Sequence, residues 1–323
     1  MVSPEEVRAA YRWILGRQPE SEDVVLYHTL ETNSVEELRS SFLSSSEFRR
    51  LPRAEAPPRP QFRPLDWPRM NVETNASPVQ LSAMMAHVEE NWRRLGLSDP
   101  HWSVVTNEAF RASNIIHTEP LFYESGRSNT EAICRTAERC GVDLAAFAEC
   151  MELGCGVGRL TIWLSELFER VVAVDISTTH LALARKAITA FKRRNVDLIH
   201  LDSFDALGEI PQFDIFVSII VLQHNPPPLI LAMLNTILKK LRPGGVAYFQ
   251  VPTYWLNYNF QINDYLTNAS PTRGIEMHLL PQYKLFDLLK ENACRVLEYR
   301  EDGWTGIDDM ISNSVFVQKE ARL

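Results

Sequence analysis

Residues Met151–Ser177 read MELGCGVGRLTIWLSELFERVVAVDIS, with glycines at the alternate positions 154, 156 and 158. An apolar run precedes these glycines and a helix-forming stretch follows them. Because glycine carries no side chain, a ligand at the carboxyl end of such a strand can touch the backbone. The spacing differs from Gly-x-Gly-x-x-Gly, the fingerprint that seats a pyrophosphate on a helix N-terminus. The stretch therefore predicts a ligand crevice of another kind in an open α/β sheet.

Acidic residues stand at three strand ends around these glycines. Glu152 lies two residues before the first glycine, where it would repel a diphosphate but suits an ammonium group. Asp175 ends the second apolar run, where a carboxylate can accept both hydroxyls of a ribose. Asp202, in LIHLDSFD, ends the third run and can accept from an exocyclic amine. Ammonium, ribose and adenine without phosphate describe S-adenosylmethionine.

Strand and helix signals alternate over the last 175 residues or so. This alternation predicts a parallel sheet with helices on both faces. A more polar final pair, CRVLEYRED and SNSVFVQK, is expected to close one edge in a partly antiparallel way. The expected strands are Glu149–Leu153, Val171–Asp175, Val196–Leu201, Phe213–Ile220 and Gly245–Val251, and the expected helices include Ser177–Arg194 and Pro228–Leu241.

Residues 146–323 resemble a class I S-adenosylmethionine-dependent methyltransferase. ELGCGVGR is similar to the first motif of that family, VVAVDIS to the second and LDSFD to the third; FDIFVSIIVLQH is similar to the fourth strand and LRPGG to the turn before the fifth. The resemblance implies a Rossmann-like, seven-stranded and mostly parallel sheet. It also implies a cofactor site that includes Tyr123, Glu152, Gly154, Cys155, Gly156, Gly158, Asp175, Ile176, Asp202, Ser203, Phe204, Val221 and Gln223. The alternative is a glycine turn that packs against its helix and binds nothing.

Two histidines are candidates for a catalytic base. His224 follows the fourth predicted strand and titrates near neutral pH, which suits proton removal; alternatively it braces the rigid turn formed by Asn225 and the prolines behind it. Gln223 is expected to orient the methionine end or the acceptor. His278, in EMHLLP, is a second candidate, with an ordinary loop histidine as its alternative. Asp308 and Asp309 are expected to lie in a solvated loop, and no metal is predicted.

Two aromatic stretches are candidates for a lid and an acceptor site. LFYESGR, Leu121–Arg127, carries Tyr123 and a glycine hinge, with simple core packing of Tyr123 as the alternative. PTYWLNYNFQINDYL, Pro252–Leu266, interleaves aromatic rings with Asn and Gln. Such a stretch suits a sugar, and equally a dimer interface or a hydrophobic natural product.

The N-terminal part predicts a separate helical module. SPEE at Ser3–Glu6 forms a capping box, and Ser34 with Glu37 forms a second one. YRWILGRQPESED and LRSSFLSSSEF resemble a small helical module of bacterial surface-glycan proteins; a purely structural helical cap is the alternative. A further helix is expected over Val79–Leu95. The predicted division is a module at 1–51, a proline-rich linker at 52–70, a helical lead-in and lid at 71–145, and the catalytic domain at 146–323.

Composition narrows the class of protein. The 323 residues carry a formal net charge of -8, which argues against nucleic acid as the main partner. No signal peptide or membrane span is predicted, and the five cysteines lack metal-ligand spacing, so a cytoplasmic protein is expected. Self-association is left open.

The hypothesis is a bacterial enzyme that O-methylates a sugar of a surface polysaccharide or its precursor. Three alternatives remain at this stage: a methyltransferase of a small-molecule metabolite, a non-catalytic regulator or scaffold that binds the cofactor or its product, and a nicotinamide-dependent oxidoreductase.

Overall fold

The structure, a computed structural model, describes residues 2–45, 47–48, 66–268 and 274–321. The chain divides into two compact units, Met1–Asp66 and Trp67–Leu323. Of the linker expected at 52–70, residues 52–65 lie outside the described residues.

The first unit is a small bundle of helices α1 (Pro4–Ile14), α2 (Glu22–Glu31) and α3 (Val35–Ser44). The first capping box is confirmed, because Glu6 N donates to Ser3 Oγ at 3.3 Å and Ser3 N donates to Glu6 Oε2 at 2.8 Å. The second is only half formed: Glu37 N donates to Ser34 Oγ, but the Glu37 carboxylate accepts from Asn33 N instead. The core of the bundle consists of Val2, Val7, Tyr11, Leu15, Val25, Leu38 and Phe42.

The second unit is built on a seven-stranded sheet in the order β4-β3-β2-β5-β6-β9-β8. The expected mostly parallel sheet is confirmed, and its antiparallel closure is confirmed in β9, which pairs antiparallel with both β6 and β8. The strands are β2 (Glu149–Leu153), β3 (Arg170–Asp175), β4 (Val196–His200), β5 (Phe213–Ser218), β6 (Leu241–Trp255), β8 (Cys294–Glu301) and β9 (Met310–Lys319).

Strand β6 is longer than the expected Gly245–Val251 at both ends. Its first residue, Leu241, pairs with Phe213 of β5, and its last, Trp255, pairs with Met310 of β9. A register shift between Pro252 and Tyr254 lets the ladder continue past the proline. The pairing partners, which lie far away in sequence, therefore extend this strand.

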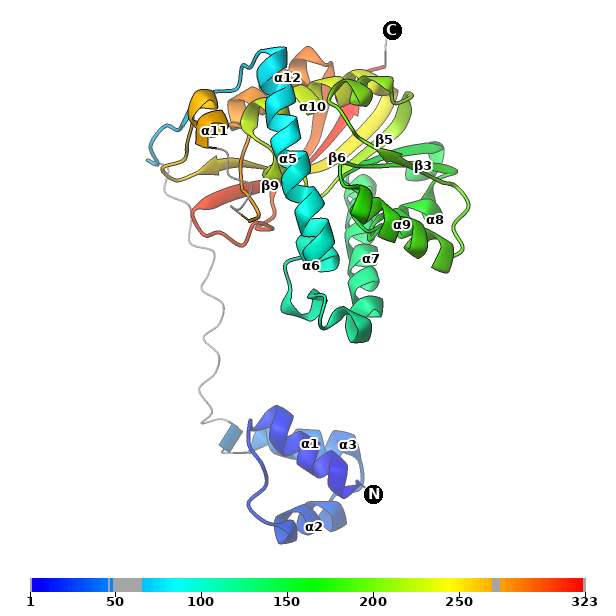
Figure 1. Cartoon of the computed structure of the whole chain (residues 1–323). Helices are drawn as coiled ribbons and strands as arrows, with labels where there is room; N and C mark the ends of the chain where they lie inside the picture. The colour runs from blue at the N-terminus through cyan, green and yellow to red at the C-terminus, as the bar shows by residue number, and fades with distance from the viewer. Residues whose placement is uncertain (1, 46, 49–65, 269–273, 322–323) are drawn as a thin grey trace. The chain divides into compact units, whose positions relative to one another are not determined.

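Helices cover both faces of the sheet, as Figure 1 shows. Alternate strand residues serve the two faces: Val172 and Val174 belong to the core that includes α10 and α12, whereas Val171 and Ala173 belong to the core that includes α7, α8 and α9. The helices are α7 (Ile115–Arg139), α8 (Thr161–Leu167), α9 (Thr178–Ala190), α10 (Pro227–Lys240) and α12 (Gln282–Glu291). The expected helix Ser177–Arg194 ends earlier, because Lys192 adopts a left-handed φ of 57°.

The lead-in differs from the prediction in one respect. The helix expected at Val79–Leu95 is confirmed as α5 (Pro78–Ser98), followed by α6 (Pro100–Val104). The glycine hinge expected within Leu121–Arg127 is wrong, because this stretch lies inside the continuous helix α7. A Cβ at Gly126 would lie 2.1 Å from the carbonyl oxygen of Arg159, so this glycine serves close packing.

The remaining elements are short. Strands β1 (Asn71–Val72) and β7 (Asn259–Phe260) pair with each other. The others are 3₁₀ helices η1 (Glu108–Phe110), η2 (Leu144–Ala146), η3 (Asp205–Glu209) and η4 (Leu222–His224), and helix α11 (Ile262–Asn268).

Candidate active site

The glycine turn after β2 is held in place by Asp175 at the end of β3. Gly154 and Gly156 have φ values of 74° and 55°, which side chains rarely adopt. Asp175 Oδ2 accepts from Gly156 N at 2.8 Å, and Asp175 Oδ1 accepts from Ser177 N at 2.8 Å. The carboxylate is 9% exposed, so these contacts order the loop between two buried strands.

A cavity opens at this edge of the sheet, next to the glycine turn. The residues predicted for the cofactor site that line it are Glu152, Gly154, Cys155, Gly156, Asp175, Ile176 and Val221. The other predicted site residues are absent from its wall: Tyr123, Gly158, Asp202, Ser203, Phe204, Gln223, His224 and His278.

Glu152 is a buried carboxylate at the cavity wall, 4% exposed. Burial raises its pKa to about 7, although Thr161 Oγ1 donates to Glu152 Oε2 at 2.6 Å and thereby opposes the shift. A cation beside this carboxylate would offset the cost of burying its charge. Its chemistry therefore fits the ammonium group expected from the sequence.

Arg159 also lines the cavity and was missed in the sequence, although it directly follows the third glycine. It is 4% exposed, and burial lowers its pKa to about 10, with Glu152 opposing the shift. Its Nη1 donates to Asn129 Oδ1 at 2.7 Å and to Ser125 Oγ at 3.2 Å, both on α7. Its Nε is buried and has no hydrogen-bond partner within the described part of the chain.

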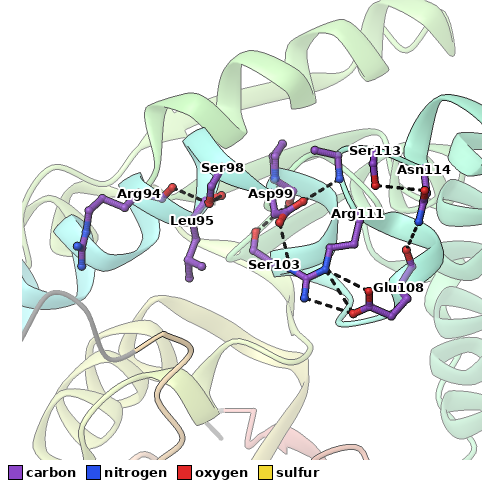
Figure 2. A network of polar contacts seen from close by, with 11 residues as sticks. Arg94, Leu95, Ser98, Asp99, Ser103, Glu108, Arg111, Ser113 and Asn114 are labelled. Atoms are coloured by element: carbon purple, nitrogen blue, oxygen red, sulfur yellow. Dashed lines mark hydrogen bonds and ion pairs between the residues drawn. The ribbon is translucent and has the colours of Figure 1, made fainter.

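Helices α5 and α6, within the lead-in and lid predicted at 71–145, supply a further part of the cavity wall. Met85, Val88 and Trp92 of α5 line the cavity, as do Ser103 and Val104 of α6. Figure 2 shows the corner between these helices: Asp99 Oδ1 accepts from Ala112 N at 2.7 Å, and Asp99 Oδ2 accepts from Arg111 Nη1 at 3.0 Å. Residues of α5 and α6 line the cavity, whereas Leu121–Arg127 of α7 do not.

His180 ties this wall to α9. Its Nε2 lies 2.9 Å from Ser103 Oγ, whose own hydroxyl donates to Pro100 O, so Nε2 carries the proton. Burial lowers the pKa of His180, and nearby Asp175 opposes the shift. The ring is therefore neutral and lines the cavity beside Asp175.

The residues predicted to read the adenine edge lie apart from the cavity wall. Asp202 and Ser203 are exposed, and Ser203 Oγ donates to Asp202 Oδ1 at 3.1 Å. Leu201 lines the cavity in their place. Tyr123 is buried and donates its hydroxyl to Val157 O at 3.3 Å, which supports the core-packing alternative for this residue.

His224 sits in a buried chain of hydrogen bonds. Ile220 N donates to Gln250 Oε1 at 3.2 Å, and Gln250 Nε2 donates to Gln223 Oε1 at 2.9 Å. Gln223 Nε2 then donates to His224 Nε2 at 3.2 Å, so Nδ1 carries the proton and donates to Glu276 O at 2.8 Å. Both ring nitrogens are engaged, which favours the bracing role over that of a base.

The pKa of His224 agrees with this arrangement. Burial lowers it to about 4, despite the Glu276 carbonyl that would favour the charged ring. A neutral imidazole with its lone pair occupied is a weak proton acceptor at neutral pH.

His278 belongs to a second polar cluster. Its Nδ1 accepts from the Tyr258 hydroxyl at 2.7 Å, and its Nε2 lies 3.5 Å from Glu276 Oε2. Glu276 also contacts His87 Nε2 at 3.3 Å and the Tyr265 hydroxyl at 3.0 Å. Burial would raise the pKa of Glu276, but these donors lower it to about 2.

Comparison with known proteins indicates which kind of ligand the cavity binds. Residues 150–245 match the family described as "Methyltransferase domain". The chain carries a class I S-adenosylmethionine-dependent methyltransferase domain. No curated protein sequence matches the chain.

Solved methyltransferases share the fold. The magnesium protoporphyrin IX methyltransferase of Synechocystis PCC 6803 with bound S-adenosylhomocysteine is 14% identical; the alignment covers 73% of this chain and 100% of that one, with a TM-score of 0.51. Its complex with S-adenosylmethionine is 15% identical over 73% of this chain and 97% of that one, with a TM-score of 0.50. The N-methyltransferase NodS of Bradyrhizobium japonicum WM9 is 15% identical over 72% and 98%, with a TM-score of 0.47.

The residues of this methyltransferase fit its cofactor, S-adenosylmethionine. The buried carboxylate of Glu152 suits the ammonium, and Asp175 has a second lone pair on each oxygen for ribose hydroxyls. Ile176, Leu201 and Val221 offer apolar walls for a base. When bound, the cofactor supplies a methyl group on a sulfonium, and the chain orients it for in-line transfer.

The described residues were also compared with the requirements of a metal site and of a membrane span. Asp308 and Asp309 are both exposed. Within the described ranges, no group of three or more His, Cys, Asp or Glu side chains is arranged to hold a metal ion. Every described helix is too short or too polar to cross a membrane.

Proposed function

We propose that this methyltransferase O-methylates a sugar of a surface polysaccharide or of its precursor. The observation that carries this proposal is an aromatic groove at the carboxyl end of β6, the end at which parallel strands bind ligands. Tyr254 and Phe286 line the groove together with Thr253 and Gln282. Aromatic faces beside hydroxyl and amide groups suit the apolar faces and hydroxyls of a sugar ring.

The rings of this groove are held in place before any acceptor binds. Tyr254 stacks on Trp67 with ring centroids 5.2 Å apart and an interplanar angle of 23°, and its hydroxyl donates to Pro68 O at 2.6 Å. A fixed ring loses little entropy on binding. The resemblance of the N-terminal module to surface-glycan proteins supports the same acceptor class.

Much of the rate acceleration of methyl transfer comes from holding the methyl donor and the acceptor in the right positions. Holding donor and acceptor in line is worth about 7–11 kcal/mol in intramolecular models. Helices α5 and α6 line the cofactor cavity, and Gln250 of the buried hydrogen-bonded chain holds Ile220 in its wall. These residues orient the reactants, and none of them needs to form a covalent bond with either.

A small apolar metabolite is the second candidate acceptor. The observation that favours it is the apolar wall of the cavity itself, where Met85, Val88 and Trp92 face Met233 of α10. An acceptor enclosed in this cavity would contact mainly hydrocarbon and aromatic surface.

The test follows a labelled methyl group. The purified protein is incubated with methyl-labelled S-adenosylmethionine and fractionated extract of the source organism, and the product is analysed by size and sugar content. We expect label in a polysaccharide or a lipid-linked glycan. Label confined to small metabolites would refute the sugar acceptor and favour the second candidate.

A shortened variant assigns the role of the N-terminal module. The unit Trp67–Leu323 has its own core, so a variant lacking residues 1–66 is expected to keep binding S-adenosylhomocysteine. Loss of glycan labelling by this folded variant would mark the module as part of acceptor recognition. Unchanged labelling would mark it as a structural cap.

A further inference from the structure

Arg159 is a buried cation whose hydrogen-bond partners are neutral. Its Nη1 is bound by the amide oxygen of Asn129 and the hydroxyl of Ser125, while its Nε is buried without a partner in the described residues. In the described part of the chain, no carboxylate lies within ion-pair distance of this guanidinium. A buried charge in this state is costly unless something else neutralises it.

Helix α7 holds the guanidinium in this position. Gly126 lets the helix approach so closely that a Cβ there would lie 2.1 Å from Arg159 O. Ser125 precedes this glycine and Asn129 lies one helical turn after Ser125, so both reach the same guanidinium. The sequence Ser-Gly-x-x-Asn thus forms a seat for Arg159.

Arg159 and Glu152, the two buried charged groups of the cavity wall, interact electrostatically without forming an ion pair within the described residues. Glu152 takes its hydrogen bond from Thr161 at 2.6 Å. One cavity therefore presents a buried carboxylate and a buried guanidinium, and the Nε of the guanidinium has no partner in the described residues. An α-amino acid carries an ammonium and a carboxylate on the same carbon, and this arrangement matches both.

We propose that Arg159 binds the carboxylate of the methionine end of S-adenosylmethionine, while Glu152 takes its ammonium. The guanidinium provides a planar fork that matches a carboxylate and exceeds a neutral donor in strength. This inference rests on the cofactor site and is independent of the proposed sugar acceptor, because its test contains no acceptor.

The test compares two ligands that differ only in the carboxylate. Binding of S-adenosylhomocysteine and of its decarboxylated analogue, which keeps the ammonium, is measured by calorimetry on the full-length protein. Charge-assisted hydrogen bonds predict that the unmodified protein binds the analogue roughly 10–100-fold more weakly. Equal affinity for the two ligands would overturn the proposal without any substitution.

Variants assign the effect to residues. Arg159→Leu is expected to lose about the same 10–100-fold for S-adenosylhomocysteine and nothing for the analogue. Glu152→Gln is expected to weaken both ligands alike, since both carry the ammonium. Arg135→Leu, which changes an exposed arginine of α7, serves as the matched control and is expected to bind both ligands normally.

If Arg159→Leu fails to fold, a substitution of Asn129, which holds the guanidinium of Arg159, tests the same proposal. Asn129→Ala keeps the guanidinium but removes its shortest hydrogen bond. We expect it to reduce the preference for the carboxylate-bearing ligand by several-fold. If Asn129→Ala and Arg159→Leu both retain the full preference, Arg159 does not bind the carboxylate.

Discussion

The two halves of the carboxyl edge of the sheet use their polar groups in opposite ways. Around β2 and β3, Glu152, Arg159 and His180 line a cavity, and two of these residues have a buried nitrogen without a partner in the described chain. Around β5 and β6, Gln223, His224 and Gln250 bind one another. Unused capacity marks a surface that awaits a ligand, whereas a closed chain of hydrogen bonds marks a scaffold.

Asp175 both lines the cavity and holds the backbone of the glycine turn. Its removal should therefore have the largest effect on ligand affinity and on stability. Asp175→Ala leaves the buried N–H groups of Gly156 and Ser177 unpaired, which is expected to cost roughly 2–5 kcal/mol of unfolding free energy. The change should also lower the affinity for S-adenosylhomocysteine by at least about 100-fold, because two charge-assisted bonds to the ribose are lost. Denaturant unfolding and calorimetry measure the two effects.

Asp308→Ala is the matched control, since that carboxylate is exposed and does not line the cavity. This control should change neither the unfolding free energy nor the affinity for S-adenosylhomocysteine appreciably. If Asp175→Ala kept its affinity within a few-fold, the ribose would not be bound at this carboxylate.

Gln250→Leu tests the other half of the comparison. It removes the acceptor for the partly buried Ile220 N and the donor to the buried Gln223 Oε1 and Ser312 Oγ, so the unfolding free energy should fall by about 2–4 kcal/mol. Ile220 has a φ of 59°, rare for a β-branched residue, so loss of this bond also releases strained backbone. Affinity for S-adenosylhomocysteine should change less than fivefold or so.

The exposed Gln212 offers a control of the same residue type, and Gln212→Leu should leave stability unchanged. A large loss of affinity in Gln250→Leu at unchanged stability would contradict the scaffold role and place the chain of amides in the binding site.

Sequence predicted the first half of the edge better than the second, for a physical reason. Glu152 and Asp175 lie at the ends of adjacent strands in one contiguous stretch, so the fold class alone places them together. Strand β4 ends at His200, so Leu201 lies in the cavity wall and Asp202 does not line it; the role of Asp202 in reading the adenine edge stays a prediction.

Contacts between residues that lie far apart in the sequence could not be predicted from the sequence. Arg159 is positioned by Asn129, and the partner of Gln223 is Gln250; neither pairing has a local signal. For His224 the sequence indicated a histidine that follows the fourth strand, and it lies in η4 after β5, but the sequence did not indicate that an amide occupies its lone pair. Periodicity likewise predicted α5 without revealing that its apolar face closes the cavity.

Binding of the cofactor beside Glu152 should be coupled to release of the proton from this carboxyl group. Burial raises the pKa of Glu152 to about 7, and the ammonium needs the ionised carboxylate. Affinity for S-adenosylhomocysteine should therefore fall by up to about tenfold for each pH unit below 7. Calorimetry between about pH 5.5 and 8 measures this slope, with Glu152→Gln as the variant in which weak binding becomes independent of pH. A flat profile in the unmodified protein would separate Glu152 from the ammonium.

The smallest expected effect is on the pH dependence of stability, where buried histidines and Glu152 act in opposite directions. Burial lowers the pKa of His224 and of His101 to about 4, from 6.5, so the unfolded chain takes up their protons first and stability falls as pH drops below 6.5. Glu152 acts the other way: its raised pKa makes the folded state hold a proton that the unfolded state has lost, and this contribution disappears as pH rises through 7. Between about pH 4.5 and 6.5, His224 and His101 each contribute a slope of about +1.4 kcal/mol per pH unit and Glu152 contributes one of about -1.4. The lowered pKa of His180 adds to the slope from the histidines. Denaturant unfolding of the cofactor-free protein should therefore show a slope that is steeper by about the same amount in Glu152→Gln and shallower by that amount in His224→Leu. A slope unchanged by either substitution would mean that the buried groups of the two halves titrate as they do in the unfolded chain.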